Sequence, residues 1–169
     1  MNPHDPDSGP QPPPLSHIEG SGSNTRARMV DVTSKEVSRR TALARAAVVF
    51  PEGVLADILR GGGPKGPIEE VARTAGILAA KRTGDLIPMC HPLSLDHVQI
   101  HFEADGNRLL IRDEAKTAGR TGVEMEAMCA AAVAALTVYD MTKAVSKGIS
   151  IESVSLLEKT GGKSGTWRA

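Results

Sequence analysis

The order in which hydrophobic patterns follow one another along the chain constrains its fold more than any other feature. Strands place apolar residues at every second position, whereas helices place them three or four positions apart. Six segments carry one of these patterns: residues 40–50 (strand), 67–81 (helix), 97–103 (strand), 108–115 (strand), 123–145 (helix) and 149–157 (strand). This order predicts an α+β fold in which helices cover one face of an antiparallel sheet.

Turn-forming residues separate these segments. A short helical turn expected at 52–59 is followed by the run Gly61-Gly62-Gly63-Pro64, which stops helices. Pro67 suits the first position of the next helix, and Asp105-Gly106-Asn107 predicts a hairpin turn. Thr121 is a residue type that can cap the second long helix. The resulting βαββαβ order is that of ferredoxin-like domains, and we expect that arrangement here.

The first 28 residues differ in composition from the rest of the chain. They hold most of the prolines, mixed with Ser, Gly, Asn and Asp, and almost no large apolar side chains. Such a segment cannot bury enough surface to offset the entropy lost on ordering. We therefore expect a disordered tail over residues 1–28 and one folded domain over residues 29–169.

Charge and composition argue against several classes of function. Twenty basic residues balance twenty acidic ones, so the molecule has no strong overall field to attract nucleic acid or an anionic membrane. The few aromatic residues, Phe50, Phe102, Tyr139 and Trp167, are too scarce to stack the bases of a single strand. No segment reads as a secretory signal or as an apolar span of roughly 20 residues. We expect a cytoplasmic protein.

The middle of the second long helix carries mostly small side chains. Hardly any side chain from Ala127 to Leu136 is large, so this helix can approach a neighbour closely but buries little area alone. We therefore expect further burial through association, as a homo-oligomer. The same helix separates Glu126 from Asp140 by roughly 21 Å, at about 1.5 Å per residue. One copy cannot easily close both ends around a small substrate, but two antiparallel copies could.

The segment from Lys81 to Leu93 combines two cations, an acid, a thiol, an imidazole and two prolines. Such chemistry is unusual for a connector and indicates a site. His91 could bind substrate or transfer protons, although a lone histidine is more often structural. No third group is identifiable to orient a pair made of Cys90 and His91, so a thiol hydrolase is disfavoured.

His97 and His101 would lie about 13 Å apart on one strand face, and no metal site is expected.

Asp140 and Lys143 are three residues apart, and therefore on one face of the second long helix. Such a pair can exchange a proton, or it can be an ordinary surface ion pair. Cations also recur near the ends of the predicted elements, where they could form a local phosphate pocket or a solvated surface. These cations are Arg40, Lys65, Lys81, Arg82, Lys143, Lys147, Lys159 and Lys163.

Several motifs, in this order, resemble the MoaC family, the cyclic pyranopterin monophosphate synthases of molybdenum cofactor biosynthesis. The resemblance covers essentially everything after the tail. Its motifs are Met29-Val30-Asp31-Val32, Lys65-Gly66, Ala80-Lys81-Arg82-Thr83, the run from Asp85 to Leu93, the run from Thr121 to Ala127, Tyr139-Asp140-Met141 with Lys143-Ala144-Val145, and the run from Leu156 to Gly165. Gly84 departs from the family pattern, since relatives can carry a bulky side chain there.

The resemblance implies a ferredoxin-like subunit in a homohexamer, a trimer of dimers with active sites at the dimer interface. It also implies a GTP-derived substrate, 3′,8-cyclo-7,8-dihydro-GTP, which such a lyase converts to cyclic pyranopterin monophosphate with release of pyrophosphate. No cofactor is implied as required, although Mg²⁺ could accompany the triphosphate.

Individual residues match the family's functional positions. Asp140 and Lys143 match its catalytic pair, to which general acid and base work is assigned. The residues that match substrate-binding positions, or fit the same phosphate-holding role, are Arg40, Lys65, Lys81, Met89, Cys90, His91, Glu124, Met125, Glu126, Lys159 and Lys163. A nonenzymatic ferredoxin-like regulator that binds a nucleotide between subunits would also explain the fold and the cations. Such a regulator needs no Asp140–Lys143 pair.

Overall fold

The structure, a computed structural model, describes residues 18–20, 22–63, 65–163 and 165–169. Its centre is a five-stranded antiparallel sheet with the order β4-β5-β3-β6-β7. The strands are β3 (Ser38–Val49), β4 (His97–Asp105), β5 (Arg108–Gly119), β6 (Ser150–Thr160) and β7 (Trp167–Arg168). The first and third of the four long strands, β3 and β5, are neighbours in the middle of the sheet, as in a ferredoxin-like sheet.

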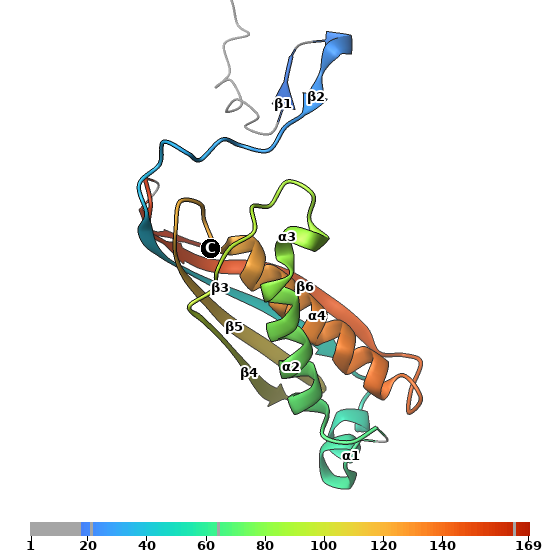
Figure 1. The fold of residues 1–169 in the computed structure, drawn as a ribbon. Coiled ribbons are helices and arrows are strands. Elements are labelled where there is room, and N and C mark those ends of the chain that lie inside the picture. Colours follow the sequence, from blue (N-terminus) through green and yellow to red (C-terminus); the bar gives the residue numbers. More distant parts are fainter. Residues whose placement is uncertain (1–17, 21, 64, 164) are drawn as a thin grey trace, which may run out of the picture.

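The two long helices lie side by side on one face of the sheet (Figure 1). They are α2 (Ile68–Lys81) and α4 (Glu124–Thr142). Two shorter helices, α1 (Val54–Gly61) and α3 (Thr83–Leu86), precede and follow α2. The helices connect the long strands in the order predicted from the sequence. The expected α+β, ferredoxin-like fold with helices on one face is therefore confirmed.

The core lies between the sheet and the two long helices. Alternate residues of β3 and β5, such as Ala44 and Ile111, face the helices and are fully buried. The two helices approach each other closely at Gly76 of α2. A Cβ atom there would lie 2.5 Å from Cδ1 of Ile100 and 2.8 Å from the carbonyl oxygen of Ala130. The small residues of both helices therefore set the spacing of the helix layer.

Replacing Gly76 by alanine should destabilise the domain. Alanine is the better helix former by about 1 kcal/mol, but its methyl group would meet the Ala130 carbonyl, which can move only if the helices separate. Overpacking of this kind costs about 1–3 kcal/mol, so the melting temperature measured by circular dichroism should fall. Gly61→Ala is the matched control, because nothing lies within 4 Å of the added Cβ. An unchanged melting temperature for Gly76→Ala would contradict the close contact.

Both ends of α4 differ from the prediction. Thr121 does not cap the helix: α4 begins at Glu124, Val123 occupies the cap position, and no side-chain hydrogen bond caps it. The predicted end at Val145 is also wrong, because α4 ends at Thr142. The Val145 N–H donates to the Thr142 carbonyl over 2.8 Å, and this three-residue hydrogen bond tightens the chain into a turn.

Other segments also hold more regular structure than predicted, among them β5, which ends at Gly119 and not at the predicted Ala115. The connector that begins at Lys81 contains α3, whose end is held by a 2.9 Å hydrogen bond from the Ile87 N–H to the Thr83 carbonyl. Strand β6 continues beyond the predicted end at Leu157, since it pairs with β3 as far as Thr160. The short strand β7 pairs with β6. These elements depend on pairing with distant residues or on a single turn, so periodicity did not indicate them.

Part of the segment predicted to be a disordered tail forms a small hairpin. Residues 1–17 and 21 lie outside the described residues. In the remainder, β1 (Ile18–Glu19) pairs antiparallel with β2 (Arg26–Ala27), and an Arg28–Glu19 ion pair of 3.3 Å adds to them. The hairpin lies apart from the five-stranded sheet (Figure 1). Its two-residue strands are held by backbone pairing rather than apolar burial, which is why composition did not predict them.

Candidate active site

The predicted site residues form two groups at opposite ends of α4. Glu124, Met125 and Glu126 lie in its first turn, whereas Asp140 lies in its last turn and Lys143 is the residue that follows the helix. The helix is one continuous element, so Glu126 and Asp140 are roughly 21 Å apart along its axis. The predicted separation is confirmed, and in one copy of the chain the predicted site residues form two separate groups.

A cleft of about 300 Å³ lies at the start of α4, and we call it the α4-start cleft. It brings the connector after α3 against the first turn of α4, although the two are distant in sequence. Its lining comprises Val30, Val32, Lys35, Met89, Cys90, His91, Leu93, Thr121, Gly122, Glu124, Met125 and Glu126. The structure thus gathers six predicted site residues, Met89 to His91 and Glu124 to Glu126, around one cleft.

Burial perturbs two ionisable side chains of the α4-start cleft. Glu126 is 3% exposed, and this burial raises the pKa of its carboxyl group to about 7. A carboxyl group with such a pKa can hold or release a proton near neutral pH. Burial also raises the pKa of the Cys90 thiol, and the Glu126 carboxylate adds to the rise. Because a protonated thiol is a poor nucleophile, this also disfavours Cys90 as a nucleophile.

A second cleft, of about 180 Å³, adjoins the first, and we call it the cationic cleft. The two share Lys35, Thr121, Gly122 and Glu124 in their linings. The cationic side chains around it are Lys35, Arg40, Arg120 and Lys159. Glu124 is the acidic residue of this lining. Such a concentration of guanidinium and ammonium groups suits a phosphate or polyphosphate.

The guanidinium of Arg40 is held in place by the end of the neighbouring strand. Its Nε donates to the Gly119 carbonyl over 3.1 Å, and one terminal nitrogen donates to the Arg120 carbonyl over 3.3 Å. Gly162 leaves room for the group, because a Cβ atom there would overlap the guanidinium. A guanidinium has five N–H donors, so others stay available for an anion in a fixed orientation.

Glu124 and Lys159 form an ion pair of 2.8 Å at the boundary between the two clefts. The carboxylate of Glu124 folds back over Gly122, where a Cβ atom would overlap it. The absence of a side chain at Gly122 thus allows Glu124 to reach Lys159. In the free protein this carboxylate neutralises one of the cations that an anionic ligand would meet.

The group at the other end of α4 comprises three charged side chains around Asp140. Lys143 Nζ lies 2.7 Å from one oxygen of the Asp140 carboxylate, and Lys65 Nζ lies 2.9 Å from the other. These hydrogen bonds, first from Lys143 and then from Lys65, lower the pKa of Asp140 to about 2. In return, Asp140 raises the pKa of Lys143. The predicted contact of Asp140 with Lys143 is confirmed, and Lys143 rests in its protonated form.

The structure does not bring every predicted residue into a cleft, and it adds two that were missed. Lys81, the exposed last residue of α2, and Lys163, exposed after β6, line neither of the two clefts. Lys35 and Arg120 were not predicted, yet both line the cationic cleft. Lys35 lies shortly before β3 and Arg120 directly follows β5, but the predicted strand ended at residue 115, so its predicted end did not point to Arg120.

Neither a metal-binding cluster nor a membrane-spanning helix is found in the described part of the chain. Within residues 18–20, 22–63, 65–163 and 165–169, no three His, Cys, Asp or Glu side chains are grouped so that they could hold a metal ion. No helix in these ranges is long and apolar enough to cross a membrane.

Comparison with known proteins places these residues in a family context. The profile described as "MoaC family" matches residues 29–162. A cyclic pyranopterin monophosphate synthase from Chloroflexus aggregans is 51% identical over 156 residues, covering 91% of this chain and 93% of the relative. Proteins of the same name from Listeria monocytogenes (55% over 145 residues, 85% and 91% covered) and Desulforapulum autotrophicum (52% over 157 residues, 92% and 94% covered) are also similar.

Proposed function

This chain belongs to the MoaC family. On that premise we propose that the two groups of site residues, one at each end of α4, are half-sites that meet around one GTP-derived substrate. The chain is a cyclic pyranopterin monophosphate synthase, a lyase of molybdenum cofactor biosynthesis. Its substrate is 3′,8-cyclo-7,8-dihydro-GTP, and pyrophosphate is released. The observation that carries the proposal is the placement of phosphate-binding cations at one end of α4 and of a Lys–Asp–Lys group at the other.

The cationic cleft suits the triphosphate. Arg40 offers oriented N–H donors there, and Lys159 becomes available when a phosphate replaces its partner Glu124. Lys81 and Lys163, which line neither cleft, are proposed to reach the phosphates from the rim. As the cyclic phosphate forms and pyrophosphate leaves, these cations stabilise the negative charge that develops. The α4-start cleft, with Met89, Cys90, His91 and Met125 in its walls, holds the ring system.

Proton transfer is assigned to the charged group at the end of α4. Opening the five-membered ring and closing a pyrazine ring require several protons to move. Lys143, protonated beside Asp140, is assigned to donate one of these protons. Lys65 keeps the Asp140 carboxylate ionised after Lys143 has given up its proton. Glu126, whose pKa lies near 7, can accept a proton at the other half-site.

A second copy of the chain is proposed to complete each site. The helix layer carries exposed apolar side chains, including Val71 and Leu78 of α2 and Leu136 of α4. Such a surface favours burial against another protein. If two α4 helices pack antiparallel, Asp140 of one copy approaches Glu126 of the other. We assign the chain to a homohexamer, a trimer of dimers with the active site at the dimer interface; sedimentation showing only folded monomer at micromolar concentration would count against this.

Turnover of the cyclised GTP intermediate tests the proposed function directly. The full chain is incubated with 3′,8-cyclo-7,8-dihydro-GTP, and pyrophosphate and the pyranopterin product are measured. Wild type should form both. Binding without turnover would contradict the proposal and favour the nucleotide-binding regulator, which the family match does not support.

Subunit complementation tests whether the site is shared. Lys143→Ala and Arg40→Ala each remove one half-site and should be inactive alone. After the two are mixed and reassembled at equal amounts, half of the dimers carry one intact site, so about a quarter of the wild-type activity should return. No recovery, despite mixed dimers seen by native mass spectrometry, would mean that each copy holds a complete site.

The remaining assignments are narrower. The catalytic domain is proposed to span residues 29–169, with no catalytic part for residues 1–28. No cofactor is assigned, and Mg²⁺ is proposed only as a counter-ion of the triphosphate. The partners are the small-molecule substrate and further copies of this chain, without nucleic acid or membrane, and the proposed compartment is the cytoplasm.

A further inference from the structure

Glu124 is the acidic residue among the cations of the cationic cleft, and it is bound to one of them. Its carboxylate lies 2.8 Å from Lys159 Nζ. In the described part of the chain, no acidic side chain is ion-paired with the other cations of this lining, Lys35, Arg40 and Arg120. The cleft therefore has an excess of positive charge in the free protein, but its Lys159 is already occupied.

The Glu124–Lys159 pair is more covered than the charged group at the other end of α4. The side chains of Lys159 and Glu124 are 33% and 27% exposed, against 47% and 54% for Lys65 and Asp140. Water screens a covered pair less, so its two charges attract each other more strongly than those of an exposed pair. An anionic ligand that binds Lys159 must therefore compete with a carboxylate that already holds it.

The surroundings of Glu124 allow its carboxylate to leave Lys159. Glu124 is the first residue of α4, and no side chain caps this helix, so the N–H groups of the first turn favour a negative charge nearby. Glu124 also lines the α4-start cleft, which gives its side chain space on the other side of the boundary. Gly122, next to the carboxylate, has no side chain that could obstruct it. The geometry thus allows one side chain to free Lys159 by rotation.

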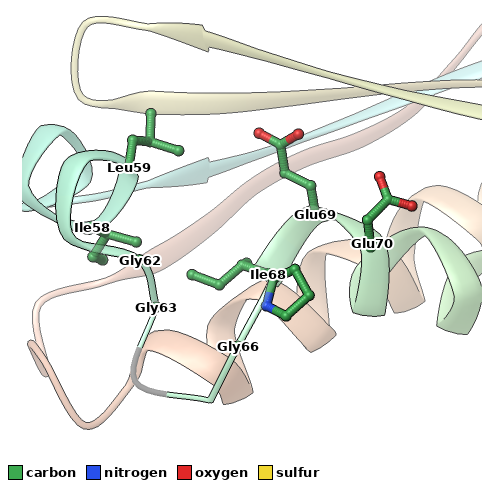
Figure 2. A pocket seen from close by; sticks show the side chains of 9 residues that line it. Ile58, Leu59, Gly62, Gly63, Gly66, Ile68, Glu69 and Glu70 are labelled. Atoms are coloured by element: carbon green, nitrogen blue, oxygen red, sulfur yellow. The ribbon is translucent and has the colours of Figure 1, made fainter.

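A cationic lining is not a general property of the pockets of this chain. Another pocket, of about 340 Å³, lies between α1 and α2 (Figure 2). The charged residues of its described lining are Glu69 and Glu70, whose carboxylates repel an anion. We therefore expect a polyphosphate to bind at the cationic cleft and not at this pocket.

We propose that Glu124 is an internal competitor of the ligand's phosphates, and that it weakens the binding of the leaving pyrophosphate. Two anions repel each other, so Glu124 acts on the phosphates by holding Lys159 and not by binding them. A polyphosphate that enters the cationic cleft takes Lys159 from Glu124. When pyrophosphate leaves, the carboxylate returns to Lys159 and opposes rebinding. The identity of the ligand as product rests on the proposed function, whereas the competition for Lys159 does not.

The first test measures the binding of inorganic pyrophosphate to the full chain by isothermal titration calorimetry at constant ionic strength. Glu124→Gln keeps the size of the side chain but removes its charge, so the dissociation constant should fall by about fivefold. Glu158→Gln is the matched control. Glu158 precedes Lys159 in β6, pairs with Arg168 over 3.0 Å and lines neither cleft, so this variant should bind as wild type does. Unchanged binding in folded Glu124→Gln would overturn the proposal.

A double-mutant cycle separates competition for Lys159 from simple repulsion between Glu124 and the ligand. Lys159→Gln should bind pyrophosphate more weakly than wild type. In that background, Glu124→Gln should tighten binding less than it does when Lys159 is present, by a factor of about three or more. Equal effects of Glu124→Gln in the two backgrounds would show repulsion alone and contradict the proposal. So would the absence of pyrophosphate binding to wild type.

Turnover assays distinguish a failure of this proposal from a failure of the proposed function. With the cyclised GTP intermediate as substrate, the inhibition constant of added pyrophosphate should fall in Glu124→Gln by the same factor as its dissociation constant. A cycle that shows coupling, in a protein that does not turn over this substrate, would support the competition for Lys159 and count against the assigned reaction. Normal turnover without coupling would leave the reaction in place and remove Glu124 as a competitor.

Discussion

Replacing Lys143 by alanine is expected to abolish turnover while leaving a folded, assembled protein. Lys143 lies at the end of α4 with its side chain about half exposed, so its removal leaves no cavity in the core. The substitution also removes the hydrogen bond that contributes most to the low pKa of Asp140. With it goes the ammonium group assigned to proton donation. Loss of a general acid typically costs about 10²–10⁴-fold in rate. The loss of turnover is measured as the rate of pyrophosphate release. Circular dichroism and sedimentation check that the variant is folded and assembled.

Lys147→Ala is the matched control for Lys143→Ala. Lys147 is an exposed lysine four positions further along, in the turn after α4, and it lines neither cleft. Its removal changes the net charge by the same amount but should leave kcat near the wild-type value. Near-normal turnover in Lys143→Ala would remove that residue from the proposed mechanism.

A buried carboxyl group should make the stability of the domain depend on pH. Asp113 of β5 is 3% exposed and lies beside Ala44 and Ile100 on the helix-facing side of the sheet. Among the residues that the structure describes, neither oxygen of its carboxyl group has a hydrogen-bond partner. Burial raises the pKa of Asp113 from 3.8 to about 8. The group is therefore neutral in the folded protein at neutral pH.

This buried carboxyl group makes stability fall as pH rises. Between pH 3.8 and about 8, the unfolded chain releases the Asp113 proton while the folded protein keeps it. The free energy of unfolding should then drop by up to about 1.4 kcal/mol per pH unit from this group. Asp113→Asn removes the titration, so its stability should depend less on pH than that of wild type. Urea unfolding at about pH 5, 6, 7 and 8 measures the slopes.

Two comparisons isolate the contribution of Asp113. Glu126, whose pKa burial also raises, adds a dependence of the same sign, but it is present in both proteins and cancels in their difference. Asp105→Asn removes an exposed carboxylate from the end of β4 and should keep the wild-type slope. Equal slopes for wild type and Asp113→Asn would show that the carboxyl group is not buried in its neutral form.

The sequence predicted the fold where the signal was local. The alternation in residues 40–50 and the helical spacing from Pro67 to Lys81 correspond to β3 and α2 within two residues at each end. Prediction failed at the ends of α4, where Thr121 offered a cap that the helix does not use. It also did not indicate β7, which exists only through its pairing with β6. A two-residue strand has no periodicity to detect.

The sequence predicted individual residues of the candidate site but not all of the contacts between them. Helical spacing was enough to place Asp140 beside Lys143, because residues three apart on a helix are always neighbours. It could not show that Lys65 completes this group, since Lys65 and Asp140 are 75 residues apart in the sequence. Lys35 and Arg120 were missed for a similar reason: each is an ordinary cation until the sheet brings it to the cationic cleft.

The sequence by itself determined the order of strands and helices, and that one continuous helix keeps Glu126 and Asp140 apart. These properties follow from the period and rise of regular backbone, which a few neighbouring residues specify. Only the tertiary structure decided which connector faces the start of α4, which glycines admit a neighbouring side chain, and that Asp113 is buried without a partner. Those properties depend on strand register and on the approach of residues far apart in sequence, which no local pattern encodes.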